Sequence, residues 1–528
     1  MGQTLRILEV WGSARHGLRV LPLAMLLACA ADGGTPMASS SRPGRPTGQP
    51  AAIGGTPATA PGTTTATTPT APNVTGPVAG NGAANPATVL LTVGGSGPMG
   101  AGLEEKGCKG LQCQQHACPS GSATTITGRV FDPAGKNPIY NVAVYVPNEA
   151  VKPLKKGASC DTCDMMYTGK AVVSSLTDAN GQFKLEKAPD GANIPLVIQI
   201  GKWRRQFTIP SVAQCQETRL PEKMLTMPKN GKEGDMPNIA IATGAADTLE
   251  CLLRRVGVDA SEYMPGAGGD GHIHIFQGSR GAGAGATGGT SLREAPNTSP
   301  AAGAASTSLW MSKDELMKYD VVLLSCEGQE TQNMNQQALH DYAAAGGRVF
   351  ASHFHYAWFN SGPYASEELA AWTPGAQNIG DIEGSIVTSF PKGEALKQWL
   401  GNTSALVNGE LPIQEARHNA DVSSVHSASQ PWILASQASK APGATQYFSF
   451  NTPTDQARVP DGKVCGRVVF SDLHVGAASH DDSLMPVPVG CKNADLSPQE
   501  KALEFMLFDL SACVIPDDVP PAPPPALN

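Results

Sequence analysis

Residues 342–353 read Tyr342-Ala343-Ala344-Ala345-Gly346-Gly347-Arg348-Val349-Phe350-Ala351-Ser352-His353, and this stretch decides the fold of the larger part of the chain. Its first half is the end of a helix predicted over residues 335–345. The glycine pair closes that helix, since glycine is common just after a helix end. The apolar run that follows is typical of a buried strand. A helix that leads directly into a buried strand is half of a crossover unit in a parallel sheet.

The same alternation of strand and helix extends in both directions from this stretch. Helical periodicity predicts further helices over 245–256 and 498–510. Strands that alternate with helices form a parallel sheet with crossover connections, so we expect an α/β domain over 236–515. Its predicted strands are Asn238–Ala242, His272–Phe276, Tyr319–Ser325, Arg348–Ser352 and Gly466–Ser471.

A different pattern precedes this domain, over residues 123–225. Short alternating or apolar runs follow one another, separated by turn residues such as Asp178-Ala179-Asn180-Gly181. Regular short strands with turn signals are typical of an all-β sandwich. The predicted strands are Thr125–Phe131, Val142–Val146, Ala171–Leu176, Pro195–Ile200 and Gln206–Ile209, with the last two joined around Lys202-Trp203-Arg204-Arg205.

Three segments have the composition of disordered chain. Residues 29–102 consist mainly of Gly, Pro, Ala, Thr and Ser, which cannot bury enough apolar surface to fold, so we expect a disordered stalk. Residues 278–308 form a low-complexity insertion in the α/β domain, and 516–528 form a proline-rich tail that we expect to be disordered. The chain is therefore multidomain, with a cysteine-rich segment at 103–122 between the stalk and the sandwich.

The first 28 residues have the layout of a secretory signal peptide. Three arginines against one acid precede a short apolar run at 20–28, which is far below the ~20 residues that span a bilayer. Leu26-Leu27-Ala28-Cys29 resembles the bacterial lipobox, and that resemblance implies lipidation of Cys29. A membrane partner through this anchor, and sorting to the outer membrane permitted by Ala30, are what the resemblance implies. A plain signal peptide and a cytoplasmic protein are the alternatives.

Charge and cysteine content narrow the class of protein. The formal net charge is −8, so we do not expect a basic surface that binds nucleic acid. In an exported protein, disulfides are the default role for the cysteines beyond Cys29, although Cys160-x-x-Cys163 also has the spacing of zinc ligands. An odd number remains, which predicts one unpaired thiol or an intermolecular bridge. The disulfide candidates are Cys108, Cys113, Cys118, Cys160, Cys163, Cys215, Cys251, Cys326, Cys465, Cys491 and Cys513.

The sandwich resembles a known accessory module. T-x-x-G-x-V-x-D-x-x-G from Thr125, then N-V-x-V from Asn141 and T-D-x-x-G-x-F from Thr177, resemble the carboxypeptidase regulatory-like domain, which has a transthyretin-like fold. The resemblance implies no catalytic residues and relatedness to carbohydrate-binding folds. Trp203, Arg204 and Arg205 are candidate ligand-binding residues for a sugar or an anionic glycan. The alternative is a hairpin whose Trp203 packs onto the sandwich.

The α/β domain resembles a second family. The helix, glycine pair and strand of residues 342–353 resemble class I glutamine amidotransferase-like domains near the trehalose-utilisation-protein branch. Residues 465–474 followed by a closing helix resemble the end of the same flavodoxin-like α/β fold. Residues 361–464 are divergent. A glutaminase requires G-x-C-x-G at the elbow and His-x-Glu after a later strand, where this chain has Ser352-His353-Phe354 and Asp472-Leu473-His474. We therefore expect no glutaminase activity.

Ligands of open α/β sheets bind beyond the carboxyl ends of the strands. The candidate catalytic residues there are Glu327, His353, His355, Asp472 and His474, beside Gly244, Asp247 and Cys326. Since Cys326, His353 and Asp472 follow three strand ends, we expect them within about 12 Å of one another, with His474 in the same cleft. His353 and His355 would share a face if their strand continues.

Three interpretations of these strand-end residues stay open. They are hydrogen-bonded loop residues of a relict pocket, a polar pocket for a ligand such as a sugar, or ligands of a divalent metal ion. For Cys326 we expect a structural disulfide, with Cys251 as a plausible neighbour, rather than an active thiol.

The sequence predicts a lipoprotein of the cell envelope with a binding role, directed at glycan or other envelope material. The alternative is an extracytoplasmic enzyme that acts on sugars through the five candidate residues at the strand ends.

Overall fold

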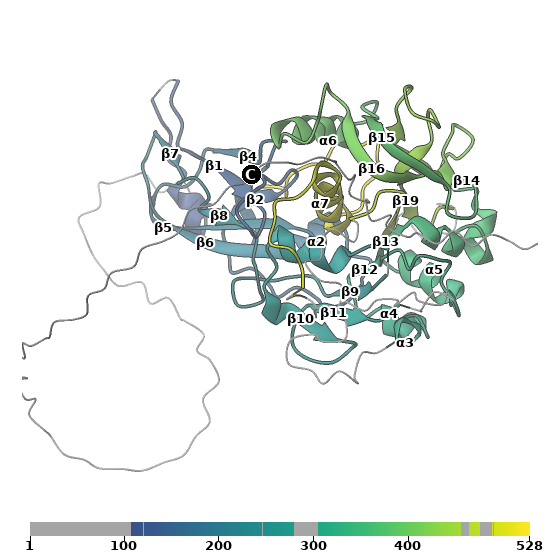
Figure 1. The fold of residues 1–528 in the computed structure, drawn as a ribbon. Coiled ribbons are helices and arrows are strands. Elements are labelled where there is room, and N and C mark those ends of the chain that lie inside the picture. The colour runs from purple at the N-terminus through teal and green to yellow at the C-terminus, as the bar shows by residue number, and fades with distance from the viewer. Residues whose placement is uncertain are drawn as a thin grey trace, which may run out of the picture. The chain divides into compact units, whose positions relative to one another are not determined.

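A computed structural model describes residues 107–527, apart from 120, 245, 279–304, 456–463, 476–487 and 489. The predicted signal peptide, Cys29, the predicted stalk and most of the insertion at 278–308 lie outside the described residues. The described residues belong to one compact unit. Figure 1 shows it as two groups of strands with helices beside them.

The first group of strands forms two small sheets, as the sequence predicted for a β-sandwich. One sheet has the order β4-β1-β7, with β8 also paired to β1, and the other has the order β3-β2-β5-β6. Gly181, at φ 69°, closes the predicted turn before β4. The strands are β1 Thr125–Phe131, β2 Ala143–Pro147, β3 Ala171–Leu176, β4 Gln182–Glu186, β5 Gly191–Ile200, β6 Trp203–Val212, β7 Glu217–Arg219 and β8 Leu225–Thr226.

The second group of strands forms one ten-stranded sheet in the order β10-β11-β9-β12-β13-β20-β19-β18-β15-β16. Its first six strands pair in parallel, and its last four are antiparallel. The parallel strands are β9 Ile239–Ala242, β10 Tyr263–Pro265, β11 Ile273–Phe276, β12 Val321–Leu324, β13 Arg348–Ser352 and β20 Gly466–Ser471. The others are β15 Asn378–Ile386, β16 Leu411–Arg417, β18 Ser429–Ala435 and β19 Thr445–Thr452.

The prediction of a wholly parallel sheet is therefore wrong for four strands. They come from residues 361–464, where no helix–strand alternation is present in the sequence. In this segment each strand returns beside its neighbour, and β19 pairs antiparallel with β20 over six residues. The segment also contributes α6 (Pro391–Asn402) and the short strands β14 (Ala371–Trp372) and β17 (Ala420–Asp421).

Helices complete the second group. The predicted helices appear as α2 (Leu249–Val256), α5 (Gln336–Ala344) and α7 (Pro498–Ser511). Ser497 begins α7 with a capping box, in which its side chain and that of Glu500 each bond to the other's backbone N–H. The shorter elements are α1 Cys163–Met166, α3 Ser306–Leu309, α4 Lys313–Leu316 and the 3₁₀ helices Gly110–Gln114, Ala260–Glu262, His353–Trp358 and Gly362–Ser366.

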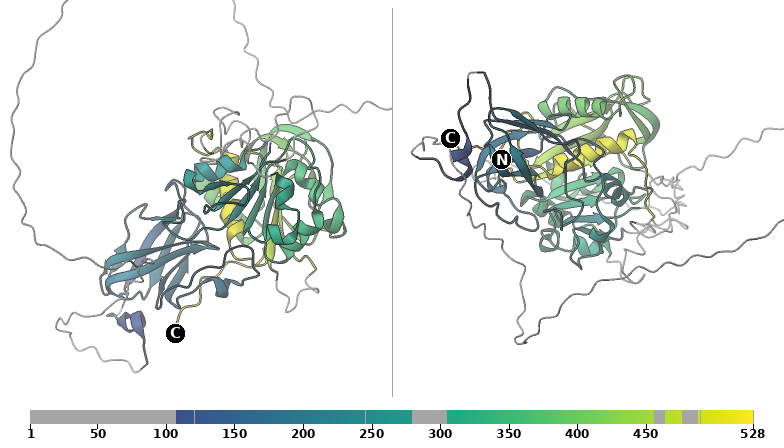
Figure 2. Two further views of the ribbon diagram at one scale, coloured as in Figure 1. Left: turned by 90° about the horizontal axis from the view of Figure 1, so that it is seen from below. Right: turned by 90° about the vertical axis from the view of Figure 1, so that its left-hand side faces the viewer.

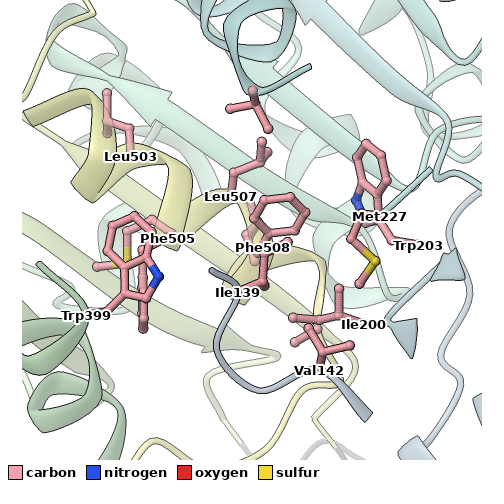
Figure 3. Packing of buried hydrophobic residues seen from close by; sticks show 14 of the residues in the cluster. Ile139, Val142, Ile200, Trp203, Met227, Trp399, Leu503, Phe505, Leu507 and Phe508 are labelled. Atoms are coloured by element: carbon pink, nitrogen blue, oxygen red, sulfur yellow. The ribbon is translucent and has the colours of Figure 1, made fainter. Parts of the chain in front are cut away.

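Helix α7 joins the two groups of strands through one hydrophobic core. Two further views show the yellow helix α7 between the blue sandwich strands and the green strands (Figure 2). Phe508 packs against Trp203 with ring centroids 5.8 Å apart, and Phe505 stacks on Tyr140 at 5.6 Å. Figure 3 shows Phe505 and Phe508 of α7 among side chains of both groups, which include Trp203 and Trp399. Sandwich and sheet therefore bury their apolar faces against each other.

Four disulfides are present among the described residues, which confirms the predicted structural role for most cysteines. The pairs are Cys108–Cys113, Cys118–Cys215, Cys160–Cys465 and Cys251–Cys491. The bond of Cys160 to Cys465 ties the sandwich region to the start of β20, across 305 residues. Cys163, Cys326 and Cys513 are outside these four disulfides, where the sequence predicted one cysteine left over as a thiol or in an intermolecular bridge.

The tail also differs from its prediction. We expected residues 516–528 to be disordered, but the described part makes defined contacts. Asp517 pairs with Arg467 at 2.7 Å, and the backbone N–H of Leu527 donates to the carbonyl of Ala171 at 2.8 Å. These partners give the proline-rich segment a fixed course along the body.

Among the described residues, no helix has the length and apolar character needed to cross a membrane.

Candidate functional site

Three strands of the large sheet end at one edge, as predicted, and bring three metal-ligating side chains together. Ser352 at the end of β13 pairs in register with Ser471 at the end of β20, and β12 lies on the other side of β13. Just beyond these ends, one ligand atom each of Cys326, His353 and His474 lies within 4.8 Å of the others. All three residues are buried. We call these residues the Cys/His cluster.

The orientation of His353 is set by its backbone and by two contacts. Strand β13 ends at Ser352, and His353 turns the chain with φ 44°, in the left-handed region that only glycine adopts easily. Its ring Nε2 donates to the carbonyl of Ala376 at 3.1 Å. Its Nδ1 is then unprotonated and lies 3.3 Å from the sulfur of Cys326. The thiol of Cys326 therefore donates to an imidazole nitrogen.

His474 is packed perpendicular to His353, with the ring centroids 5.0 Å apart. The backbone carbonyl of Glu415 is a hydrogen-bond partner of the His474 ring. Within the described chain, Nε2 of the same ring is buried and has no hydrogen-bond partner. An unpartnered polar atom in the interior is uncommon and calls for an explanation.

Burial keeps both histidines of the cluster neutral. It holds the pKa of His353 well below its usual value, with His474 and Arg417 acting in the same direction. Burial also lowers the pKa of His474 to about 3, again helped by the charge of Arg417. Neutral imidazoles keep a lone pair that can accept a proton or bind a metal ion.

A chain of hydrogen bonds holds Cys326 from behind. Its backbone N–H donates to the hydroxyl oxygen of Ser352 at 2.9 Å, and that hydroxyl donates to the carboxylate of Asp247 at 2.9 Å. Asp247 also accepts from the N–H of Val475 at 2.8 Å. Burial raises the pKa of Asp247 to about 7, against the opposing effect of these donors.

Asp472 lies at the same edge, but it faces the divergent segment. Its Oδ2 accepts from the backbone N–H of Asn419 at 2.8 Å, while its buried Oδ1 has no partner among the described residues. Burial raises its pKa to about 7.

Glu327 and His355 belong to a separate group, which we call the His355 network. Ring Nε2 of His355 donates to the carbonyl of Ser325 at 2.8 Å, and its Nδ1 accepts from the indole N–H of Trp358 at 3.1 Å. The hydroxyl of Thr331 lies 3.1 Å from that Nδ1 and 3.3 Å from Glu327 Oε1. Burial lowers the pKa of His355 to about 4. Strand β13 does not continue through His355, so the shared face expected for His353 and His355 is absent.

Cys326 also departs from its predicted role. We expected a structural disulfide with Cys251 as a plausible neighbour, but Cys251 pairs with Cys491. Cys326 is instead a buried thiol in contact with His353. Cys251 and Cys326 are not bonded to each other because Cys251 lies on α2, where it reaches Cys491, whereas Cys326 lies just past the end of β12.

Arg417, Asn419 and the carbonyls of Ala376 and Glu415 were missed by the sequence analysis. All four lie in residues 361–464, and Arg417 ends the antiparallel strand β16. Their position depends on how the antiparallel strands return to the sheet edge. No motif or spacing in the sequence marks them.

Trp203, Arg204 and Arg205 do not form a ligand-binding hairpin tip. They lie in β6 instead of at the turn, and Trp203 is fully buried against Phe508. Arg204 pairs with Asp235 at 2.8 Å, and Arg205 pairs with Glu233 at 3.0 Å. The alternative, a Trp203 that packs inward, is what the structure contains. Its reason is the apolar surface of α7, which covers this end of the sandwich.

The sandwich carries a polar groove over β1, β4 and β7, with a volume of about 410 Å³. We call it the β1 groove. Its floor includes Gly128, where an added Cβ would lie 3.0 Å from the ring of Phe183. Charged side chains of both signs line it, and Thr127 donates to Glu217 across it at 2.6 Å. The charged lining residues are Arg129, Asp178, Lys184, Glu217, Arg219 and Glu222.

The two sites suit different chemistry. The Cys/His cluster offers a thiol, two neutral imidazoles and a nearby guanidinium, but its residues are almost completely buried. Such a set can bind a metal ion or hold a proton. The β1 groove is open and offers many hydrogen-bonding groups to a polar ligand.

Comparisons with known proteins give no family. No protein-family model matches the chain, and no curated protein sequence matches it. A mutant type II cohesin–X-dockerin complex from Acetivibrio cellulolyticus matches with 16% identity over 27% of this chain and 76% of that chain, at a TM-score of 0.14. The major pilin subunit BcpA of Bacillus cereus matches with 16% identity over 20% of this chain and 30% of that chain, at 0.12. Similarity at this level carries no argument about fold or function.

Proposed function

We propose that the chain is an exported protein of the bacterial envelope that binds glycan or similar polar envelope material through the β1 groove. The single observation that carries this proposal is the groove itself, an open polar groove with a volume of about 410 Å³ on the sandwich. Sugar hydroxyls both donate and accept hydrogen bonds, and acidic and basic side chains in one groove supply partners for both roles. The role is binding, without glutaminase activity.

Two features support export and anchoring. Four disulfides are typical of proteins that fold in an oxidising compartment. The signal-like residues 1–28 and the lipobox-like sequence before Cys29 then favour a lipid anchor at the outer membrane or cell surface. Replacing Cys29 with Ser should release the full-length protein from the membrane fraction. Retention of the variant by membranes after a salt wash would contradict the anchor.

The strand order of the large sheet supports its proposed resemblance to flavodoxin-like folds. With β10 set aside as an edge strand, the parallel strands have the spatial order β11-β9-β12-β13-β20, which is 2-1-3-4-5 in chain order. This is the order of flavodoxin-like folds, to which amidotransferase-like domains are related. The two small sheets likewise favour a transthyretin-like sandwich. In this proposal, the large sheet supports the sandwich and does not bind the glycan, because its strand-end residues are buried.

Co-sedimentation of the purified chain with isolated cell-wall polysaccharide tests the binding role. The double variant Lys184→Ala/Arg219→Ala removes two exposed charges from the groove, and we expect binding to weaken about tenfold. The matched control is Lys170→Ala/Lys440→Ala, which removes positive charge outside the groove. Equal binding by both double variants, or no binding by the parent chain, would overturn the proposal.

A second function has one observation in its favour. The 3.3 Å contact of the Cys326 sulfur with His353 Nδ1 is the pairing that activates a thiol nucleophile. An extracytoplasmic enzyme acting on sugars would need this site to open. Rapid alkylation of Cys326 in the folded protein would favour this alternative, whereas labelling only after denaturation would support the binding role.

A further inference from the structure

The β1 groove makes no use of the Cys/His cluster, which lies at the edge of the other sheet. Cys326 follows β12, His353 follows β13 and His474 follows β20, so three separate strands supply its members. Convergence of three soft or borderline ligands from separate elements is how proteins build metal centres.

We propose that Cys326, His353 and His474 bind a single thiophilic metal ion, and that Cu⁺ matches the site best. The proposal rests on the 4.8 Å limit that contains one ligand atom from each residue. A metal ion that binds sulfur at about 2.3 Å and nitrogen at about 2.0 Å holds those ligand atoms about 3.5 Å apart. The observed 3.3 Å between Cys326 Sγ and His353 Nδ1 is close to that spacing.

The neighbours of the cluster hold two of its members in a binding orientation. A metal-binding histidine normally donates its other ring N–H to a carbonyl or a carboxylate. His353 does so, with Nε2 on the carbonyl of Ala376, which leaves Nδ1 to the cluster. Cys326 is fixed through its own N–H by Ser352, and Ser352 is fixed by Asp247.

His474 gives independent support. It is 3% exposed, and its Nε2 has no hydrogen-bond partner within the described chain, although its ring already bonds to the carbonyl of Glu415. Burial of a polar atom without a partner is unfavourable. A bound ion gives that nitrogen a partner and removes the cost.

The charges around the cluster select the ion. Arg417 acts on both histidines, and it disfavours additional positive charge. A Cu⁺ ion with the Cys326 thiolate forms a neutral unit, whereas Zn²⁺ with one thiolate keeps a positive charge. Asp472 interacts electrostatically with Arg417 and offsets part of its charge. Thiolate and imidazole are ligands that suit Cu⁺.

Binding releases one proton. Only the thiolate binds a metal ion, so the proton that leaves is that of the Cys326 thiol, whose sulfur forms the bond to copper. Apparent affinity should therefore rise with pH, because protons compete with the metal for the thiolate.

The test is an anaerobic titration of the full chain with Cu⁺, in competition with a coloured copper chelator, and metal analysis of the recovered protein. The background carries Cys163→Ser and Cys513→Ser, which removes the two other described thiols. We expect a single Cu⁺ per chain. Cys326→Ser and His474→Gln should each lose at least about 100-fold in affinity, since even outer-shell changes cost 10- to 100-fold.

The matched control is His340→Gln, a histidine bonded to Glu367 and outside the cluster, and it should bind copper like the background. Binding that is equal in Cys326→Ser and in the background would overturn the proposal. Binding of Zn²⁺ with exclusion of Cu⁺ would overturn the choice of ion. If the cluster variants do not fold, Cu⁺ should still protect Cys326 from alkylation in the background protein during partial denaturation, and unprotected labelling would overturn the site.

Discussion

Two buried histidine sites lie at one edge of the large sheet, and they differ in how completely their atoms are satisfied. In the His355 network, both ring nitrogens of His355 have partners, and these come from Ser325, Trp358 and Thr331. In the Cys/His cluster, Nε2 of His474 has no partner in the described chain. A completed network is typical of structural support, and an incomplete one is typical of a site that accepts a ligand.

The largest expected effect comes from breaking the completed network. In His355→Leu the carbonyl of Ser325 and the indole N–H of Trp358 lose their buried partner. Each unsatisfied buried group costs about 1–3 kcal/mol, so we expect a loss of about 3 kcal/mol in the free energy of unfolding. Urea denaturation of the wild type and the variant measures it. A loss below about 1 kcal/mol would mean that the network is not a structural support.

The next effect is a difference in pH dependence. The pKa of His355 is lowered to about 4, so the folded state resists the proton that the unfolded chain binds below its own pKa of about 6.5. Stability from the neutral ring is therefore lost as pH falls below about 6.5. His355→Gln removes this effect. As the pH is lowered from 7 to 5, the free energy of unfolding of the variant should rise by about 2 kcal/mol relative to that of the wild type.

His340→Gln is the control of opposite sign. The carboxylate of Glu367 raises the pKa of His340, so the charged ring stabilises the fold at low pH, and this contribution is lost as pH rises. The variant should lose stability relative to the wild type as pH falls. Denaturant unfolding at several pH values measures both variants. Parallel curves for the two would contradict the assigned environments.

The difference between the sites shows what the sequence could predict. Strands β12, β13 and β20 each contain a run of apolar residues, and their parallel pairing places Cys326, His353 and His474 together, as we expected. The sequence could not separate His353 from His355. That distinction depends on the left-handed turn at His353, which ends β13 and directs the two rings to different partners. A non-glycine residue with positive φ is held there by its surroundings, and no local pattern indicates it.

The other side of the cluster was unpredictable for a related reason. Arg417 and the carbonyls of Ala376 and Glu415 reach it from antiparallel strands and loops in residues 361–464. Strand β16, which carries Glu415 and Arg417, takes its register from antiparallel pairing with β15, and β15 pairs in turn with β18, so the register depends on pairing along the sheet. The pattern of short strands and turn residues predicted two small sheets in the sandwich region, but it could not indicate that α7 would cover Trp203.

A smaller effect is expected at the centre of the His355 network. The hydroxyl of Thr331 lies between Glu327 and His355, at 3.3 and 3.1 Å. Thr331→Val keeps the shape of the side chain and removes that hydroxyl. We expect a loss of about 1 kcal/mol, the usual net contribution of one hydrogen bond. Thr454→Val, at a hydroxyl bonded to Glu367 elsewhere, is the control, and a smaller loss at Thr331 than at Thr454 would contradict its place in the network.

The smallest effect is expected in the cluster, when no metal is bound. His474→Leu deletes a buried ring whose Nε2 has no partner, and the side chain that replaces it is apolar and of similar size. The loss of the bond to the carbonyl of Glu415 is then offset by the removal of an unsatisfied polar atom. The free energy of unfolding of chelator-treated protein should change by less than about 1 kcal/mol, well below the change in His355→Leu. A loss as large as that of His355→Leu would mean that His474 is a structural residue like His355, and the contrast between the two sites would fail. If the contrast holds, copper should raise the free energy of unfolding of the wild type and leave that of His474→Leu unchanged. Only a folded state that binds the ion is stabilised by it, and the variant lacks one of the three metal ligands.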